Sequence, residues 1–159
     1  MTDLKEEFWG RMAGIRSAML GIKGQGRLVA MSPRVDKDLP GDVWFITANG
    51  TELGKSVQSG PQTAQLVIVD DGAGLYADLE GTLTHCTDQK ALDEVWNSSA
   101  EAWFDDGKTD PQVCLMRFSP AMGEISVTPA SGVKYLYEMA KARITGTTPD
   151  VGDQGDVVF

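Results

Sequence analysis

The chain has 159 residues, of which 42 % are hydrophobic; 14 Lys and Arg residues stand against 23 Asp and Glu residues, so the formal net charge is −9. This hydrophobic content is typical of one folded domain with its own core and excludes an intrinsically disordered chain. The negative charge excludes general binding to nucleic acid or to an anionic membrane, because both would repel it.

Apolar periodicity and turn residues divide the chain into helices and strands. In chain order the predicted elements are a helix over 4–15, strands over 18–22, 27–31 and 43–47, a short helix over 52–58, strands over 63–69 and 75–84, a helix from 87 or 88 to 96, strands over 113–118 and 124–127, and a helix over 134–142. Asp3 and Glu6 are placed to cap the first helix, and Thr51 to cap the short one.

Turn residues are frequent, with 18 Gly and 7 Pro, as expected for a strand-rich fold. Residues 102–111 are expected to form a loop, and the Gly-, Asp- and Pro-rich residues 145–159 a loosely held tail. Neighbouring strands joined by short turns favour an antiparallel barrel or sandwich with helices packed outside it. No repeat or domain boundary interrupts this pattern.

Location is predicted from what the sequence lacks. No apolar run approaches the roughly 20 residues of a membrane span, and residues 1–7 lack the basic and apolar regions of a signal peptide. Two cysteines, Cys86 and Cys114, are too few for a disulfide framework. We therefore expect a reduced cytoplasmic location and no membrane partner.

Catalytic and metal-binding patterns are weak. The single histidine, His85, adjoins Cys86, but neighbouring residues on a strand point to opposite faces and cannot form a Cys–His dyad. The acidic pairs at 70–71 and 105–106 are more typical of solvated turns than of a cation site. No catalytic residue and no metal site are predicted.

The segment from Thr47 to Lys55 has chemistry that suits a phosphate. A strand ends at Thr47, a Gly-containing turn follows, and a short helix begins near Thr51. Free N–H groups at the helix start, two threonine hydroxyls and the Lys55 ammonium would all favour an anion. An ordinary capped helix has the same pattern, and the spacing alone favours that simpler interpretation.

Several motifs together resemble a known family. The most specific are Trp44-Phe-Ile-Thr47 and the aromatic segment 103–111, in which Trp-Phe is followed by Gly107 and then by Asp-Pro. With Gly60-Pro61 and the 140–152 segment they span nearly the whole chain. On these residues the chain is similar to the pyridoxamine 5′-phosphate oxidase-like proteins with the FMN-binding split-barrel fold, and to their bacterial general stress protein branch.

The resemblance implies a mainly β fold, a six-stranded antiparallel split β-barrel with flanking helices over residues 1–146, and an acidic C-terminal tail over 147–159. It implies a homodimer that binds FMN, or FAD, at the subunit interface. The implied function is a stress-related flavin-dependent oxidoreductase of unknown substrate. The alternative is a non-enzymatic dimeric split-barrel module that has lost tight FMN binding.

Carried over by position, the resemblance implies that the cofactor contacts the second and third strands, the short helix and one loop. The implied residues are Val29, Ala30, Met31, Ser32, Phe45, Ile46, Thr47, Thr51, Leu53, Lys55 and Trp103, with Trp103 reaching over from the partner subunit.

The chain departs from the family pattern at two cations. Many relatives have Arg-Pro-Met where this chain has Val29-Ala-Met31 or, in another register, Met31-Ser-Pro33. The family lysine falls at Leu53, two residues before Lys55. Loss of charge-assisted hydrogen bonds is expected to weaken phosphate binding. The net charge itself does not oppose an anionic cofactor here, because residues 1–69 hold seven acidic and eight basic residues, while the acidity is concentrated in 70–110.

Overall fold

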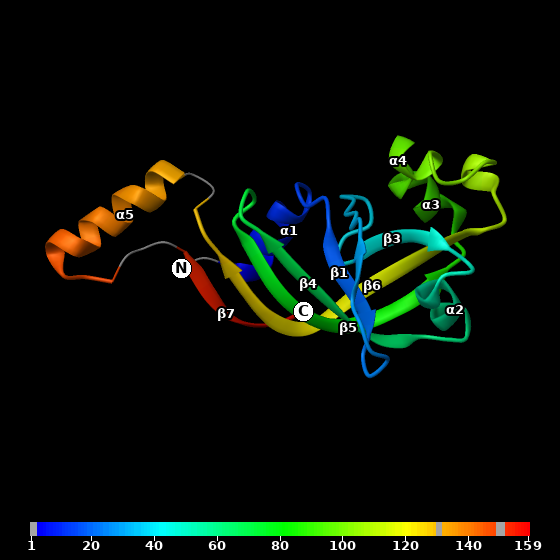
Figure 1. The fold of residues 1–159 in the computed structure, drawn as a ribbon, viewed down its shortest axis with the longest axis horizontal. Coiled ribbons are helices and arrows are strands. Elements are labelled where there is room, and N and C mark those ends of the chain that lie inside the picture. Colours follow the sequence, from blue (N-terminus) through cyan, green and yellow to red (C-terminus); the bar gives the residue numbers. More distant parts are fainter. Residues whose placement is uncertain (1–2, 130–131, 149–151) are drawn as a thin grey trace.

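The computed structural model describes residues 3–129, 132–148 and 152–159. In chain order its elements are α1 (Leu4–Met12), β1 (Ala18–Ile22), β2 (Val29–Met31), β3 (Val43–Ala48), α2 (Glu52–Gln58), β4 (Gln62–Asp70), β5 (Leu75–Cys86), α3 (Gln89–Val95), α4 (Ser98–Glu101), the 3₁₀ turn η1 (Gly107–Thr109), β6 (Val113–Val127), α5 (Gly132–Thr145) and β7 (Asp153–Val158) (Figure 1). None of the helices in the described part of the chain is long and apolar enough to cross a membrane.

The strands form one antiparallel sheet that curls on itself. They pair in the order β2-β1-β4-β5-β6-β3, with β7 also paired to β6. Just after β2, the backbone of Arg34 forms a bridge with Trp44 of β3 through two N–H···O bonds of 2.9 and 2.8 Å. This bridge joins the two ends of the strand order and closes a barrel that keeps a seam. The prediction of a six-stranded antiparallel split barrel with flanking helices is confirmed.

Two apolar clusters hold the fold together. Side chains alternate between the two faces along β4 and β5, as the period of two requires. The inward-facing residues fill the barrel, and those with no exposed surface include Leu20, Phe45, Leu66, Ile68, Leu79, Leu83, Met116 and Phe118. A second cluster joins α3 to the outer face of the barrel through Leu92, Val95, Trp44 and Leu115.

The first helix is shorter than predicted. Asp3 caps it as expected, since its carboxylate accepts hydrogen bonds from the N–H groups of the residues two and three positions ahead. The helix ends at Met12 rather than at Ile15, because the N–H groups of Gly14 and Ile15 bond to carbonyls three residues back and tighten the last turn. Ile15 is nevertheless buried, as its apolar character requires.

The prediction of two strands around Pro120 is wrong, because β6 is one strand of fifteen residues. Its first half pairs with β3 and its second half with β7, so the partner on that side changes near Pro120, where a missing N–H costs little. On the other side β5 pairs with β6 from Leu115 to Val127, with a register shift between Glu80 and Gly81. A Cβ at Gly81 would lie 2.3 Å from the carbonyl oxygen of Ser119, so this bulge requires glycine.

The prediction of a loosely held tail is wrong for residues 153–158, which form β7. This strand pairs with β6 over 122–127. Val157 is buried, and the Phe159 ring packs edge-on against Phe8 and Trp9 of α1, with centroid distances of 5.6 and 6.0 Å. Residues 149–151 of the predicted tail lie outside the described residues, and the division of the chain at residue 146 stays a prediction.

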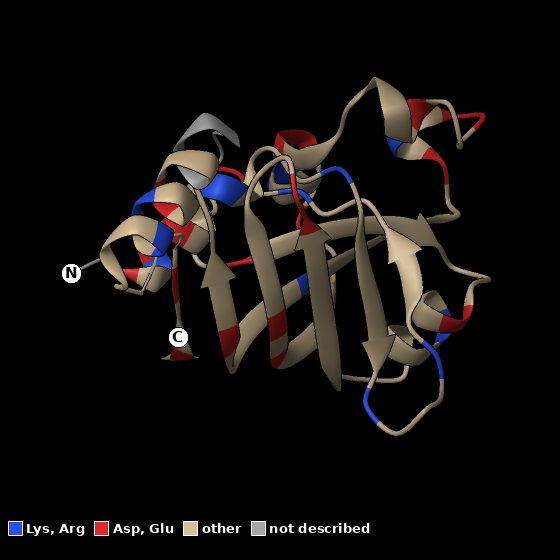
Figure 2. Ribbon diagram, turned by 60° about the vertical axis from the view of Figure 1, so that its left-hand side comes forward, with Lys and Arg blue, Asp and Glu red and all other residues tan. Residues whose placement is uncertain are grey.

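The segment predicted as a loop over 102–111 contains the 3₁₀ turn η1, and the helix α4 precedes it. Asn97 caps α4 by accepting a hydrogen bond of 3.0 Å from the N–H of Ala100. Helix α5 extends away from the barrel (Figure 1), and it carries exposed apolar side chains that include Leu136 and Ile144. Charged residues are frequent on the helices and turns, and some also lie on the strands (Figure 2).

We predict that the Phe159→Ala substitution lowers the free energy of unfolding by about 2 kcal/mol, because it removes an aromatic contact that joins β7 to α1. Urea unfolding followed by circular dichroism measures the change. The Val158→Ala substitution is the matched control, since Val158 is 73 % exposed and its loss should change stability by less than about 0.5 kcal/mol. Equal effects of the two substitutions would mean that the C-terminal strand does not stabilise the barrel.

Candidate functional site

The seam of the barrel is hollowed into a cleft. Among the described residues, β2 pairs only with β1 and β3 only with β6, apart from the single bridge between Arg34 and Trp44. Two adjoining cavities of about 320 and 370 Å³ occupy this unpaired region. They share four lining residues, Ala30, Met31, Thr47 and Thr51. We call the two together the seam cleft.

The smaller part, the hairpin cavity, lies between the β1–β2 turn and α2. Its walls are largely apolar, and its lining residues are Ile22, Gln25, Arg27, Val29, Ala30, Met31, Thr47, Thr51, Glu52, Leu53 and Ser56. The Ser56 hydroxyl donates to the side-chain carbonyl of Gln25 at 3.3 Å, and this bond links α2 to the turn.

The larger part, the lobe cavity, lies between β3 and the α4 segment. Ser32, Arg34 and Ile46 line it from the barrel side, and Ser99, Ala100, Trp103 and Phe104 line it from the helical side. Trp103 is 85 % exposed, so one wall of this cavity is a large aromatic surface open to solvent. Such a surface is suited to stacking against a flat ligand or to burial by another chain.

The turn between β3 and α2 is held by its own hydroxyl groups. The oxygens of Thr47 and Thr51 lie 3.0 Å apart, and the Thr51 hydroxyl also donates to the carbonyl of Ala48 at 2.9 Å. The same Thr51 oxygen accepts from the N–H of Gly54 at 3.1 Å, so Thr51 is the predicted N-cap. A Cβ at Gly54 would lie 2.4 Å from the Ala48 oxygen; helix α2 therefore packs directly on the end of β3.

The structure brings nine of the eleven predicted site residues to the seam cleft: Val29, Ala30, Met31, Ser32, Ile46, Thr47, Thr51, Leu53 and Trp103. Trp103 lines the cleft of its own chain, and its reach to a partner subunit stays a prediction. The structure does not bring the other two side chains there. Phe45 is fully buried inside the barrel, and Lys55 is exposed on α2 outside the cleft lining. The role of each residue in binding stays a prediction.

Sequence reasoning missed several cleft residues. Gln25 and Arg27 come from the β1–β2 turn, and Glu52 and Ser56 from the same face of α2. The helical spacing of 52 and 56 placed these two together, but only the fold brings the β1–β2 turn opposite α2.

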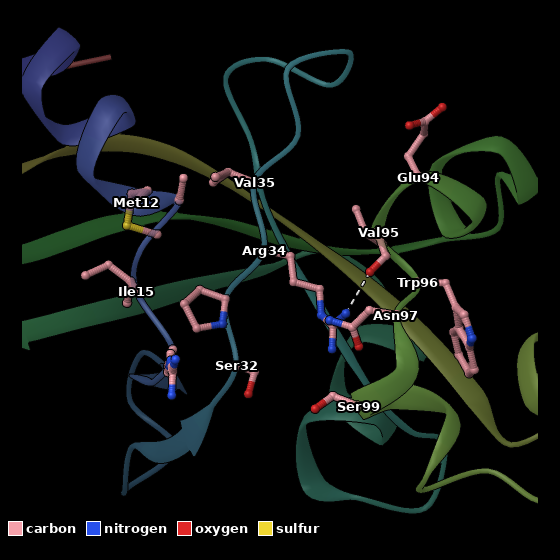
Figure 3. A pocket seen from close by; sticks show the side chains of 13 residues that line it. Met12, Ile15, Ser32, Arg34, Val35, Glu94, Val95, Trp96, Asn97 and Ser99 are labelled. Atoms are coloured by element: carbon pink, nitrogen blue, oxygen red, sulfur yellow. Dashed lines mark hydrogen bonds between the residues drawn. The ribbon is translucent and has the colours of Figure 1, made fainter. Parts of the chain in front are cut away.

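Arg34 lines both the lobe cavity and a neighbouring cavity of about 580 Å³, which is shown in Figure 3. Its Nη1 group donates to the carbonyl of Val95 at 2.8 Å and so ties the end of α3 to the barrel. Its Nε is buried and has no hydrogen-bond partner among the described residues, and burial lowers the pKa of the Arg34 guanidinium. The Nε1 of Trp44 is likewise buried and unpartnered.

Other reactive groups lie apart from the cleft. His85 is exposed, and Cys86 lies half-buried against the α3 cluster. Cys114 is fully buried, and this burial raises the pKa of its thiol to about 11. The carboxylates of Asp36, Asp38 and Glu94 lie within 4.8 Å of one another, but this is a surface acidic cluster, and one oxygen of Asp36 accepts a hydrogen bond from the N–H of Asp38.

Comparison with known proteins gives a family match and structural relatives. A family model described as pyridoxamine 5′-phosphate oxidase like matches residues 3–150. A provisionally named general stress protein 26 from Jannaschia sp. CCS1 is 60 % identical, over 99 % of this chain and 98 % of its own, with a TM-score of 0.94. No curated protein matches the chain.

More distant structures share the fold. The general stress FMN/FAD binding protein from Xanthomonas citri is 29 % identical over 80 % of this chain and 91 % of its own, with a TM-score of 0.70. A protein from Clostridium acetobutylicum related to general stress protein 26 is 20 % identical over 78 % of this chain and 89 % of its own, with a TM-score of 0.61; this likeness concerns the fold alone.

We predict that at pH 8 the native protein exposes one thiol, Cys86, to the thiol reagent DTNB, and that Cys114 reacts only after unfolding. Cys114 is buried, and its pKa of about 11 keeps the thiol protonated.

Because the unfolded thiol ionises near its ordinary pKa of 9.0, the contribution of Cys114 to the free energy of unfolding should fall as pH rises from 9 to 11. The Cys114→Ala variant should not lose stability in this way between pH 9 and 11. Rapid modification of both thiols by DTNB in the folded protein would contradict the burial of Cys114.

Proposed function

The chain belongs to the pyridoxamine 5′-phosphate oxidase-like family, and from that premise we propose that it binds a flavin, FMN or FAD, in the seam cleft. The observation that carries the proposal is the unpaired seam itself, where β2 and β3 separate and leave cavities of about 320 and 370 Å³. Their size and their mainly apolar walls with a few polar groups are those of a small-molecule site. The FMN/FAD binding protein of Xanthomonas citri, 29 % identical, supports the same ligand class.

The walls of the cleft fit a flat heteroaromatic ring. Val29 and Met31 offer half-buried apolar side chains from β2, and Leu53, a buried side chain of α2, also lines the hairpin cavity. Ala30 leaves room because its side chain is small, and it lines both cavities. These residues would hold the ring system, while Thr47 adds a polar group at the junction of the two cavities.

The hairpin cavity offers few charged groups that could bind the phosphate of FMN. The charged residues lining the hairpin cavity in the described part of the chain are Arg27 and Glu52, which are opposite in sign. Lys55 does not line either cavity. The hairpin cavity therefore fits the ring of a flavin better than it fits the phosphate.

A bound flavin would supply hydride or single-electron transfer, and the chain would bind and orient it and limit access of water. We propose an oxidoreductase role on this basis and assign no substrate. The alternative is a barrel without enzymatic activity that has lost tight FMN binding, and the opposed charges of Arg27 and Glu52 favour it.

A second subunit would complete the site. Trp103 lines the lobe cavity with 85 % of its surface exposed, and burial of this ring by a partner is the physical reason to propose a homodimer. A cytoplasmic, stress-related role stays a prediction.

We predict that riboflavin or FMN added to the apoprotein loses fluorescence on binding and raises the melting temperature. The Ala30→Trp substitution should fill the cleft and weaken flavin binding at least tenfold, because Ala30 lines both cavities. The matched control is Ala121→Trp, at an exposed alanine outside the cleft, which should bind flavin as the unmodified chain does. If no flavin binds at high micromolar concentration, the proposal fails and the non-enzymatic alternative stands.

A further inference from the structure

We propose that the seam cleft recognises the flavin by its ring and ribityl chain and gains little from the terminal phosphate, so that riboflavin binds about as well as FMN. This inference rests on the proposed flavin-binding function and specifies its ligand class. It follows from what the cleft offers a phosphate, which at neutral pH carries a charge between −1.5 and −2 and needs cations or free N–H donors.

The two charges that line the hairpin cavity oppose each other, and Arg34, the cation that lines the lobe cavity, already donates from Nη1 to the Val95 carbonyl at 2.8 Å. Arg27 and Glu52 line the hairpin cavity from opposite sides, the first from the β1–β2 turn and the second from the first turn of α2. Each is exposed, so each interacts weakly with a phosphate through water, and the two act in opposite directions. Figure 2 shows charges of both signs on α2.

The two threonine hydroxyls and the Gly54 N–H at the start of α2 are already engaged. The Thr51 hydroxyl donates to the Ala48 carbonyl at 2.9 Å, lies 3.0 Å from the Thr47 hydroxyl and accepts from the Gly54 N–H at 3.1 Å. A phosphate would have to break these bonds in order to form its own. In addition, the Glu52 carboxylate already compensates the positive end of α2.

Lys55 does not supply a cation to a phosphate in the cleft. Glu52, Leu53 and Ser56 line the hairpin cavity from one face of α2, and the helical period of 3.6 residues turns Lys55 to the side of that face. Lys55 is exposed and lines neither cavity.

Apolar side chains, by contrast, line both cavities. Val29, Met31 and Leu53 contribute them in the hairpin cavity, and Ile46, Phe104 and Trp103 in the lobe cavity. Ring burial between such walls contributes the same free energy whether or not a phosphate is attached. We therefore expect most of the binding free energy of a flavin to come from burial of its ring.

The test is to measure dissociation constants of the full-length protein for riboflavin, FMN and lumiflavin, the ring without its ribityl chain, by flavin fluorescence at fixed ionic strength. One hydrogen bond to a charged phosphate would favour FMN over riboflavin by roughly 10- to 150-fold. We expect a preference below tenfold. A preference of tenfold or more would overturn the inference, even if the cations came from a second subunit, while leaving the flavin-binding function intact. Absence of binding by all three compounds would overturn the proposed function, and the inference with it.

Two matched substitutions on α2 sharpen the test. Glu52→Gln removes the opposing carboxylate and should raise the preference for FMN over riboflavin by about two- to fivefold, the size of one exposed charge interaction. Lys55→Gln, three residues away, should leave that preference unchanged. A loss of FMN preference of tenfold in Lys55→Gln, with riboflavin binding unaltered, would identify Lys55 as a phosphate ligand and contradict the inference.

Discussion

The backbone bridge between Arg34 and Trp44 is the constraint on which the rest of the structure depends. Two hydrogen bonds of 2.9 and 2.8 Å join the ends of the strand order at this point. Because β2 is only three residues long and, in the part of the chain that the structure describes, pairs only with β1, the bridge closes the barrel without pairing β2 with β3. The unpaired stretch that remains is the seam cleft. The same bridge therefore both closes the barrel and leaves the cleft open.

The same residue also positions the helical lobe. The Arg34 guanidinium binds the Val95 carbonyl at 2.8 Å, and the Trp44 ring packs with Val95 and Leu92 in the outer cluster. The segment after α3 carries Ser99 and Trp103 to the far wall of the lobe cavity. Both walls of the cleft are thus tied to the closing bridge, one through the backbone and one through a side chain.

Local patterns in the sequence predicted much of this, and long-range pairing decided the rest. The alternation in β4 and β5 and the caps at Asp3 and Thr51 are encoded within a few residues, so they could be read directly. The continuity of β6 through Pro120 depends on a change of partner from β3 to β7, and the order of the C-terminal strand depends on a contact with α1 some 150 residues earlier. Neither contact leaves a local signal. Similarly, resemblance brought Phe45 and Lys55 into the predicted site, but the strand period turns Phe45 into the barrel and the helix period turns Lys55 aside.

The most direct test of the account is a crystal structure of the protein grown with riboflavin. The account predicts electron density for the ring in the seam cleft, beside Met31 of β2 and Thr47 of β3, with the Arg34–Trp44 bridge intact. A ring bound elsewhere, such as in the 580 Å³ cavity on the other side of Arg34, or a β2 fully paired with β3, would contradict the claim that incomplete closure of the barrel creates the binding site.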